Sequence, residues 1–158
     1  MDFDREVVIQ PLFPSVPAPK TDSAAADLIR LCLPAQFAYI TIARNAVDTI
    51  GEQLKLSEDS RSAVKLAVGE ACNNAVQYGS SPENRKILVA CRILPGLLEI
   101  DVISEDTGFR PQPSNHTMPA TEDLAEHGRG LALIDMLMDS VEYLFASGTF
   151  LVRLQKSF

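Results

Sequence analysis

The sequence predicts an α/β fold in two layers, in which a mixed, mostly antiparallel β-sheet carries helices on one face. Three long segments place apolar residues at helical spacing: residues 35–54, 57–78 and 128–141. Two pairs of shorter apolar segments are each joined by a turn signal of the hairpin type, Pro95-Gly96 in one pair and Ser147-Gly148 in the other. Antiparallel hairpins need helices over only one face of their sheet, so this order favours the two-layer arrangement.

Length and composition indicate one globular domain, residues 30–158, preceded by an N-terminal extension, residues 1–29. The chain has 158 residues, of which 46% are hydrophobic and 22% charged, and this is enough for one core. Its formal net charge of −7, without a cluster of Lys and Arg, argues against a nucleic-acid partner. No apolar run reaches the roughly 18 residues of a membrane span. The acidic start, "MDFDREVVIQ", is unlike a signal peptide, so we expect a cytoplasmic protein with no membrane partner.

The elements follow from local signals, beginning with the N-terminal half. The extension is rich in proline and is predicted to be flexible or loosely docked, with "VVIQPLF" (7–13) as at most a short edge strand. The first strand of the domain is "LIRLCLP" (28–34), and the helix over residues 35–54 follows it. The second helix has Ser57 as its N-cap and is ended by Gly79, because glycine is favoured just after a helix.

The C-terminal half contains the two hairpins, with a loop and the third helix between them. The first hairpin pairs "KILVACRIL" (86–94) with "LLEIDVIS" (97–104). A polar loop with several prolines leads to the helix over residues 128–141. The closing hairpin pairs "VEYLFA" (141–146) with "TFLVRLQ" (149–155).

The three cysteines are Cys32, Cys72 and Cys91. They lie far apart in apolar surroundings and lack the spacing of metal ligands. We therefore expect buried, reduced thiols.

The stretch "AVGEACNNAVQYG" (67–79) places an acid and an amide on one side of the second helix. Glu70 and Asn74 are four residues apart, about one helical turn. A carboxylate there can deprotonate a nucleophile, and an amide oxygen can complete a magnesium shell. Such pairs are also common on solvated faces, so this pair needs a second feature to support it.

The stretch "HGRGLALI" (127–134) supplies that second feature. Gly128 and Gly130 flank Arg129 immediately at the start of a helix, where free backbone N–H groups and the positive end of the helix dipole favour an anion. Glycine lets a phosphate approach the backbone closely. The stretch is not a Walker loop, because no Gly-Lys-Ser/Thr follows.

A strand-end stretch, "VISEDTGFRP" (102–111), stands between these two features in the sequence. Together the three motifs, in this order, resemble the ATP-binding fold shared by gyrase, histidine kinases and MutL. Within that fold the chain resembles the anti-sigma factor serine kinases over residues 31–156. "LAVGEACNNAVQYG" is similar to their Glu-x-x-x-Asn-Ala helix, "GRGLALIDMLMDSVEY" to their Gly-x-Gly helix, and "GTFLVRLQK" to their closing strand.

The resemblance implies a role for each matching residue. Glu70 would be the catalytic base and Asn74 the ligand of Mg²⁺ in the ATP site. Residues 128–131 would border the phosphates of ATP: Gly128, Arg129, Gly130 and Leu131. Arg44 stands where these kinases place an arginine that contacts partners, although a plain surface arginine is at least as good a reading.

The adenine-contacting motif of these kinases, Asp-x-Gly-x-Gly, can be matched in two ways. Without a gap before "GFRP", Ser104 takes the position of the acid and Gly108 that of the second glycine. Alternatively, Asp106 is the acid and Gly108 the first glycine. We expect Asp106 and Gly108 to contact the nucleotide, by a narrow margin over the Ser104 alignment.

The resemblance implies an anti-sigma factor that acts as an ATP- and Mg²⁺-dependent protein serine/threonine kinase. Its partners would be a sigma factor that it sequesters and an anti-anti-sigma (STAS-type) protein whose serine it phosphorylates, and it would work as a homodimer. The competing reading is a non-catalytic protein-binding regulator on the same fold, with impaired nucleotide binding. A serine in place of the adenine-contacting acid would favour this second reading, because hydrogen bonds to charged groups contribute about 1.5–3 kcal/mol.

Overall fold

The computed structural model describes residues 27–78, 85–105, 126–146 and 148–158. The proposed edge strand at residues 7–13 and most of the predicted N-terminal extension lie outside these residues, as do Asp106 and Gly108. Among the described helices none is long and apolar enough to cross a membrane.

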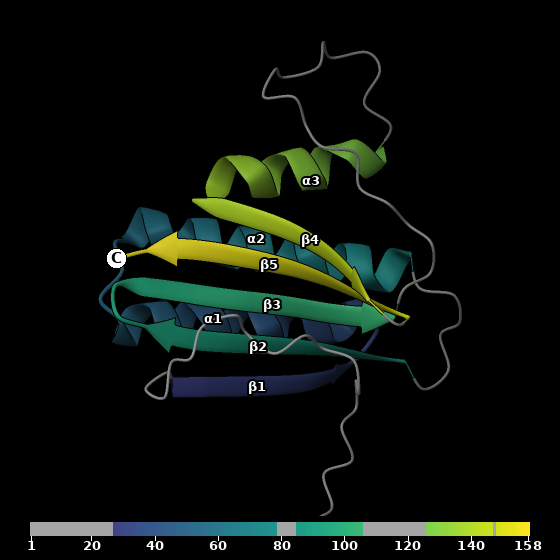
Figure 1. Ribbon diagram of the computed structural model, residues 1–158, viewed down its shortest axis with the longest axis horizontal. Helices are drawn as coiled ribbons and strands as arrows, with labels where there is room; N and C mark the ends of the chain where they lie inside the picture. Colours follow the sequence, from purple (N-terminus) through teal and green to yellow (C-terminus); the bar gives the residue numbers. More distant parts are fainter. Residues whose placement is uncertain (1–26, 79–84, 106–125, 147) are drawn as a thin grey trace, which may run out of the picture.

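The sheet has five strands in the spatial order β1-β2-β3-β5-β4 (Figure 1). The strands are β1 (Asp27–Pro34), β2 (Lys86–Leu94), β3 (Leu97–Glu105), β4 (Ser140–Ala146) and β5 (Thr149–Ser157). All four pairings are antiparallel, whereas the prediction allowed for a mixed sheet. Both predicted hairpins form, and their turn glycines, Gly96 and Gly148, have φ of 70° and 78°, a conformation that glycine adopts without strain.

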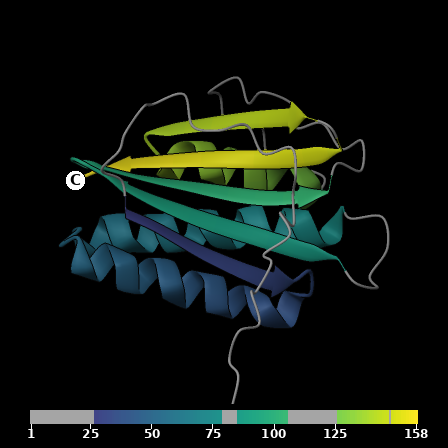
Figure 2. The same ribbon diagram turned by 60° about the horizontal axis from the view of Figure 1, so that its bottom comes forward.

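The helices lie together on one face of this sheet, with α2 between α1 and α3 (Figures 1 and 2). Their bounds are α1 (Ile40–Gln53), α2 (Glu58–Gln77) and α3 (Glu126–Leu137), and a short 3₁₀ turn, η1 (Phe37–Tyr39), precedes α1. The predicted two-layer α/β fold is therefore confirmed. The predicted N-cap of α2 also forms, because the Ser57 hydroxyl oxygen accepts a hydrogen bond from the N–H of Ser60 at 3.2 Å.

Two helix boundaries differ from the prediction. The first helix does not begin at Ala35, because the N–H of that residue bonds the carbonyl oxygen of Arg85 and continues the strand. The third helix begins at Glu126, two residues before Gly128, and ends at Leu137 rather than near Val141. Asp139 explains this end: its carboxylate accepts hydrogen bonds from the Ser157 N–H and the Lys156 ammonium group, which fix the turn into β4. These hydrogen bonds lower the pKa of Asp139.

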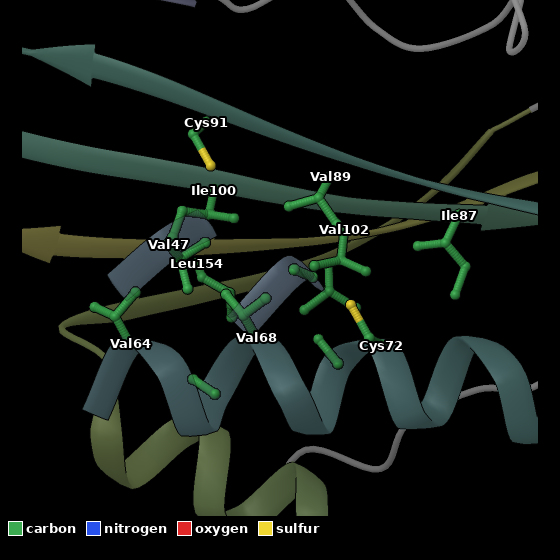
Figure 3. Packing of buried hydrophobic residues seen from close by; sticks show 14 of the residues in the cluster. Val47, Val64, Val68, Cys72, Ile87, Val89, Cys91, Ile100, Val102 and Leu154 are labelled. Atoms are coloured by element: carbon green, nitrogen blue, oxygen red, sulfur yellow. The ribbon is translucent and has the colours of Figure 1, made fainter. Parts of the chain in front are cut away.

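The core lies between the helices and the sheet. Figure 3 shows Val68 and Cys72 of α2 pointing toward Ile100 and Val102 of β3, and all four side chains are at most 2% exposed. Because side chains alternate along a strand, the residue two positions beyond Val102 faces the same helical layer. That residue is Ser104, so the end of β3 and the second half of α2 share one side of the molecule.

The opposite face of the sheet carries a buried ionic network that links three strands. The Arg153 guanidinium donates hydrogen bonds to both carboxylate oxygens of Asp101, at 2.8 and 3.0 Å. Arg92 donates to Asp101 and to Glu99, and Gln155 donates to the second oxygen of Glu99 at 2.7 Å. Asp101 is completely buried. The hydrogen bonds to Asp101 raise the pKa of the Arg153 guanidinium.

Replacing Asp101 by asparagine is expected to destabilise the fold by about 3–5 kcal/mol, since it leaves two buried guanidinium groups with one carboxylate. Urea unfolding at neutral pH measures this difference. Asp48→Asn is the matched control, because Asp48 makes its ion pairs with Arg61 and Lys65 at the surface, where such pairs contribute little. Equal losses in the two variants would contradict a structural role for the network.

The cysteines only partly follow the prediction of buried thiols. All three are free, and Cys72 and Cys91 are buried, but Cys32 on β1 is exposed. Cys32 is exposed because β1 is an edge strand and this side chain points away from the helices, opposite to Leu33 in the core. Burial raises the pKa of the Cys72 and Cys91 thiols to about 12.

At pH 8, only Cys32 is expected to react with a thiol reagent in the folded protein. The reactive species is the thiolate, which is scarce for thiols whose pKa is about 12. Mass spectrometry of the labelled chain counts the modified sites, and labelling in denaturant, where all three should react, is the control. Early modification of Cys72 in the folded protein would contradict the packing of α2 on the sheet.

Candidate functional site

The site lies between α2 and α3, where the two predicted motifs meet. Within α2, Glu70 and Asn74 occupy the side next to α3, while Val68 and Cys72 face the sheet. A Cβ atom built on Gly130 of α3 would lie 2.8 Å from Oε2 of Glu70 and 3.9 Å from Oδ1 of Asn74. The structure therefore brings together Glu70, Asn74 and Gly130, three of the residues that the sequence analysis singled out.

Asn74 has a buried side-chain amide group that is not fully hydrogen-bonded. Its side chain is only 9% exposed, and its amide nitrogen has no hydrogen-bond partner among the described residues. Buried polar atoms in folded proteins are nearly always paired, so this nitrogen is a candidate for a partner beyond the described residues. The assignment of nitrogen and oxygen in such an amide can be exchanged, so either atom can face that partner.

The start of α3 supplies backbone N–H groups, which are hydrogen-bond donors. The first four N–H groups of an α-helix have no partner within the helix, and in α3 these belong to residues 126–129, which include Gly128 and Arg129. Gly130 follows in the first turns of the helix, against Glu70, and Leu131 is buried. An anion at this helix start would meet free N–H groups and the positive end of the helix dipole.

The end of β3 presents a hydroxyl group on this side of the sheet. Ser104 is 6% exposed and is paired in register with Phe150 of β5, which belongs to the core. Among the described residues of β3, Ser104 is the last one that faces the helices, and the acid that follows it, Glu105, points to the other face. The competing candidates, Asp106 and Gly108, lie outside the described residues.

One contact between α1 and α2 was missed by the sequence analysis. A Cβ atom on Gly69 would lie 3.2 Å from Cδ of Arg44, so the stem of Arg44 packs against α2 at Gly69. Arg44 itself is exposed. Gly69 itself was the signal in the sequence. A glycine inside a helix is about 1 kcal/mol less favourable than alanine, so its presence there indicates that another group approaches the helix closely.

These residues fit a magnesium nucleotide. The buried amide of Asn74 lacks a partner within the described residues, and an amide oxygen is a suitable ligand for Mg²⁺ in company with phosphate oxygens. The helix start of α3 suits the phosphates. The absence of a side chain at Gly130 leaves room for the Glu70 carboxylate beside them.

Comparison with known proteins shows the family of this chain. The model of the histidine kinase-like ATPase domain matches residues 33–156. A solved structure, that of the RsbU and RsbW domains of Rv1364c from Mycobacterium tuberculosis, superimposes with a TM-score of 0.62 at 16% identity, covering 83% of this chain and 32% of that chain. The present chain thus spans about a third of that longer protein, and the likeness supports the fold.

Curated relatives are more similar in sequence. The serine-protein kinase RsbW of Bacillus velezensis is 30% identical over 136 residues, 80% of this chain and 83% of the relative. That of Bacillus licheniformis is 33% identical over 135 residues, 78% and 82% of the two chains, and that of Bacillus subtilis is 31% identical over 133 residues, 78% and 81%. The chain therefore belongs to the histidine kinase-like ATPase family and, within it, to the family of the serine-protein kinases RsbW.

Proposed function

We propose that this protein is an anti-sigma factor and an ATP- and Mg²⁺-dependent serine kinase. The observation that carries the proposal is the meeting of Glu70, Asn74 and Gly130 between α2 and α3. A base, a ligand for a metal ion and a helix start suited to phosphate are the parts that phosphoryl transfer requires. This chemistry depends mainly on positioning and on charge neutralisation, so a domain of this size suffices.

Each residue of the site has a separate role in the proposed reaction. Asn74 would hold Mg²⁺ through its side-chain oxygen, and the ion, when bound, would neutralise charge on the phosphates. The N–H groups at the start of α3, including those of Gly128 and Arg129, orient the terminal phosphate. Glu70 accepts the proton of the attacking serine hydroxyl, from a carboxylate that lies against Gly130. If Asp106 or Ser104 contacts the adenine, the base lies at the end of β3.

The proposed partners are proteins. The chain would sequester a sigma factor and phosphorylate a serine of an anti-anti-sigma protein of the STAS type, as a cytoplasmic homodimer. Arg44 is offered as a partner contact because its side chain is exposed on α1, where its stem packs against Gly69 of α2.

The test is transfer of the terminal phosphoryl group of ATP to STAS-type proteins of the same organism. Intact-mass measurement is expected to show the gain of one phosphoryl group on one of these proteins, dependent on Mg²⁺. Mutation of the acceptor serine to alanine in that protein is the control and should abolish the gain. Binding of Mg²⁺ and ATP without transfer to any STAS-type protein would contradict the kinase assignment.

A further inference from the structure

Ser104 is the polar exception among the residues of β2 and β3 that face the helices. On β3 the other helix-facing residues are Leu98, Ile100 and Val102, and the residues paired with them on β2 are apolar or cysteine as well. Ser104 is nevertheless only 6% exposed. Burial of a hydroxyl is unfavourable unless it has a hydrogen bond, so a buried serine at the end of an apolar row is informative in a way that a further apolar residue would not be.

This serine lies level with the last turn of α2, which carries Asn74. The helix and β3 run side by side in the same direction, with Cys72 beside Val102 (Figure 3). From this pair, Ser104 is about 7 Å farther along the strand at roughly 3.3 Å per residue, and residues 74–77 are about 3–8 Å farther along the helix at roughly 1.5 Å per residue. Ser104 and Asn74 therefore lie at the same end of the interface between α2 and the sheet.

We propose that the Ser104 hydroxyl contacts the purine base of the bound nucleotide at its 6 position, and that the site therefore accepts hypoxanthine nucleotides about as well as adenine nucleotides. The inference rests on the proposed function, because it requires the phosphates to lie at Asn74 and the start of α3. From there the sugar and base would extend toward the sheet, where Ser104 offers a buried hydroxyl. The edge of a purine farthest from the ribose carries the 6 position, so this is the edge that a buried residue meets.

A hydroxyl group suits both kinds of purine. Adenine carries a 6-amino group, which donates hydrogen bonds, whereas hypoxanthine carries a 6-oxo group, which accepts them. The serine O–H can donate one hydrogen bond and its oxygen can accept others, so the hydroxyl can rotate to match either base. A carboxylate in the same place would only accept hydrogen bonds and would therefore select adenine. Ser104 is thus the residue that sets the base specificity of the site.

Calorimetric titration of the full-length chain with ADP and with inosine diphosphate (IDP), both with Mg²⁺, measures this specificity without depending on catalysis. The two dissociation constants are expected to agree within about threefold, because either base keeps one hydrogen bond to the hydroxyl. GDP should bind more weakly than both, since its additional 2-amino group needs hydrogen-bond partners of its own.

Ser104→Asp is expected to raise the ratio of the IDP to the ADP dissociation constant by about tenfold or more, because a charged acceptor binds the 6-amino group strongly and repels the 6-oxo group. Ser104→Thr keeps the hydroxyl and should keep the original ratio. Ser62→Asp is the matched control, since it adds the same charge at an exposed serine in the first half of α2. If Ser104→Asp does not fold, Ser104→Ala replaces it and should weaken the binding of ADP and IDP by the same factor, about fivefold.

A preference for ADP over IDP of more than about thirtyfold in the unaltered protein would overturn the inference, as would a ratio that Ser104→Asp leaves unchanged. Asp106→Asn should not alter the ratio. If that variant shifts the ratio and Ser104→Asp does not, the contact belongs to Asp106. Each of these results leaves the proposed kinase function intact, whereas failure of the unaltered protein to bind any of the three nucleotides would remove the nucleotide site and both claims together.

Discussion

Replacing Glu70 by glutamine is expected to slow phosphoryl transfer by about a hundredfold to ten-thousandfold, the range that a positioned general base contributes. Glutamine preserves the size and the hydrogen-bonding reach of the side chain but cannot accept the serine proton. Binding of the magnesium nucleotide should persist, because Asn74 and the start of α3 are unchanged. The initial rate of phosphorylation and the nucleotide affinity, measured on the same preparation, separate the two effects.

The control for this variant is Glu52→Gln. Glu52 is an exposed acid near the end of α1, so its replacement changes the net charge equally without touching the site. It should leave both the transfer rate and the affinity unaltered. A Glu70→Gln protein that transfers phosphate at the original rate would remove Glu70 from the mechanism.

Replacing Gly130 by alanine is expected to slow phosphoryl transfer by about a hundredfold, since small displacements of a reacting group have effects of this size. The new Cβ atom would stand 2.8 Å from Oε2 of Glu70, so the carboxylate must move away. The fold should keep its stability or gain slightly, because alanine is favoured over glycine inside a helix by about 0.5–1 kcal/mol. Rate measurements and thermal unfolding of the same variant show both changes.

Met136→Ala is the comparison within the same helix. Met136 is 69% exposed on α3, so its truncation removes no packed group from the site. Its transfer rate should equal that of the unchanged protein. If folded Gly130→Ala protein transfers phosphate at the original rate, then the close contact between α3 and Glu70 does not govern catalysis.

Much of the fold could be predicted from local signals. The N-cap at Ser57 and the hairpin turns at Gly96 and Gly148 are each determined by the conformational preference of one or two residues, and each forms as expected. The extent of α3 could not be predicted in this way. Its end depends on the hydrogen bonds of Asp139 with Ser157 and Lys156, which are distant in sequence.

In the candidate site, too, local features could be predicted from the sequence, whereas contacts between distant segments could not. The spacing of Glu70 and Asn74 put both residues on one helical face, and the glycines at 128 and 130 indicated an anion site at a helix start. Their approach to one another is a tertiary contact between α2 and α3, which helical periodicity does not encode. The network around Asp101 was missed for a similar reason. Its charges come from β2, β3 and β5 and meet only through the register of the sheet.

The central claim is that Asn74 and the start of α3 hold a magnesium nucleotide. Calorimetric titration with ADP in the presence of Mg²⁺ tests it most directly, with GDP as the control for base selection and Asn74→Ala as the matched variant. We predict binding with a Kd on the order of micromolar that requires Mg²⁺, favours adenine and is lost in Asn74→Ala. No binding by the unaltered protein up to millimolar ADP would contradict the claim and would favour a regulator that acts only through protein contacts.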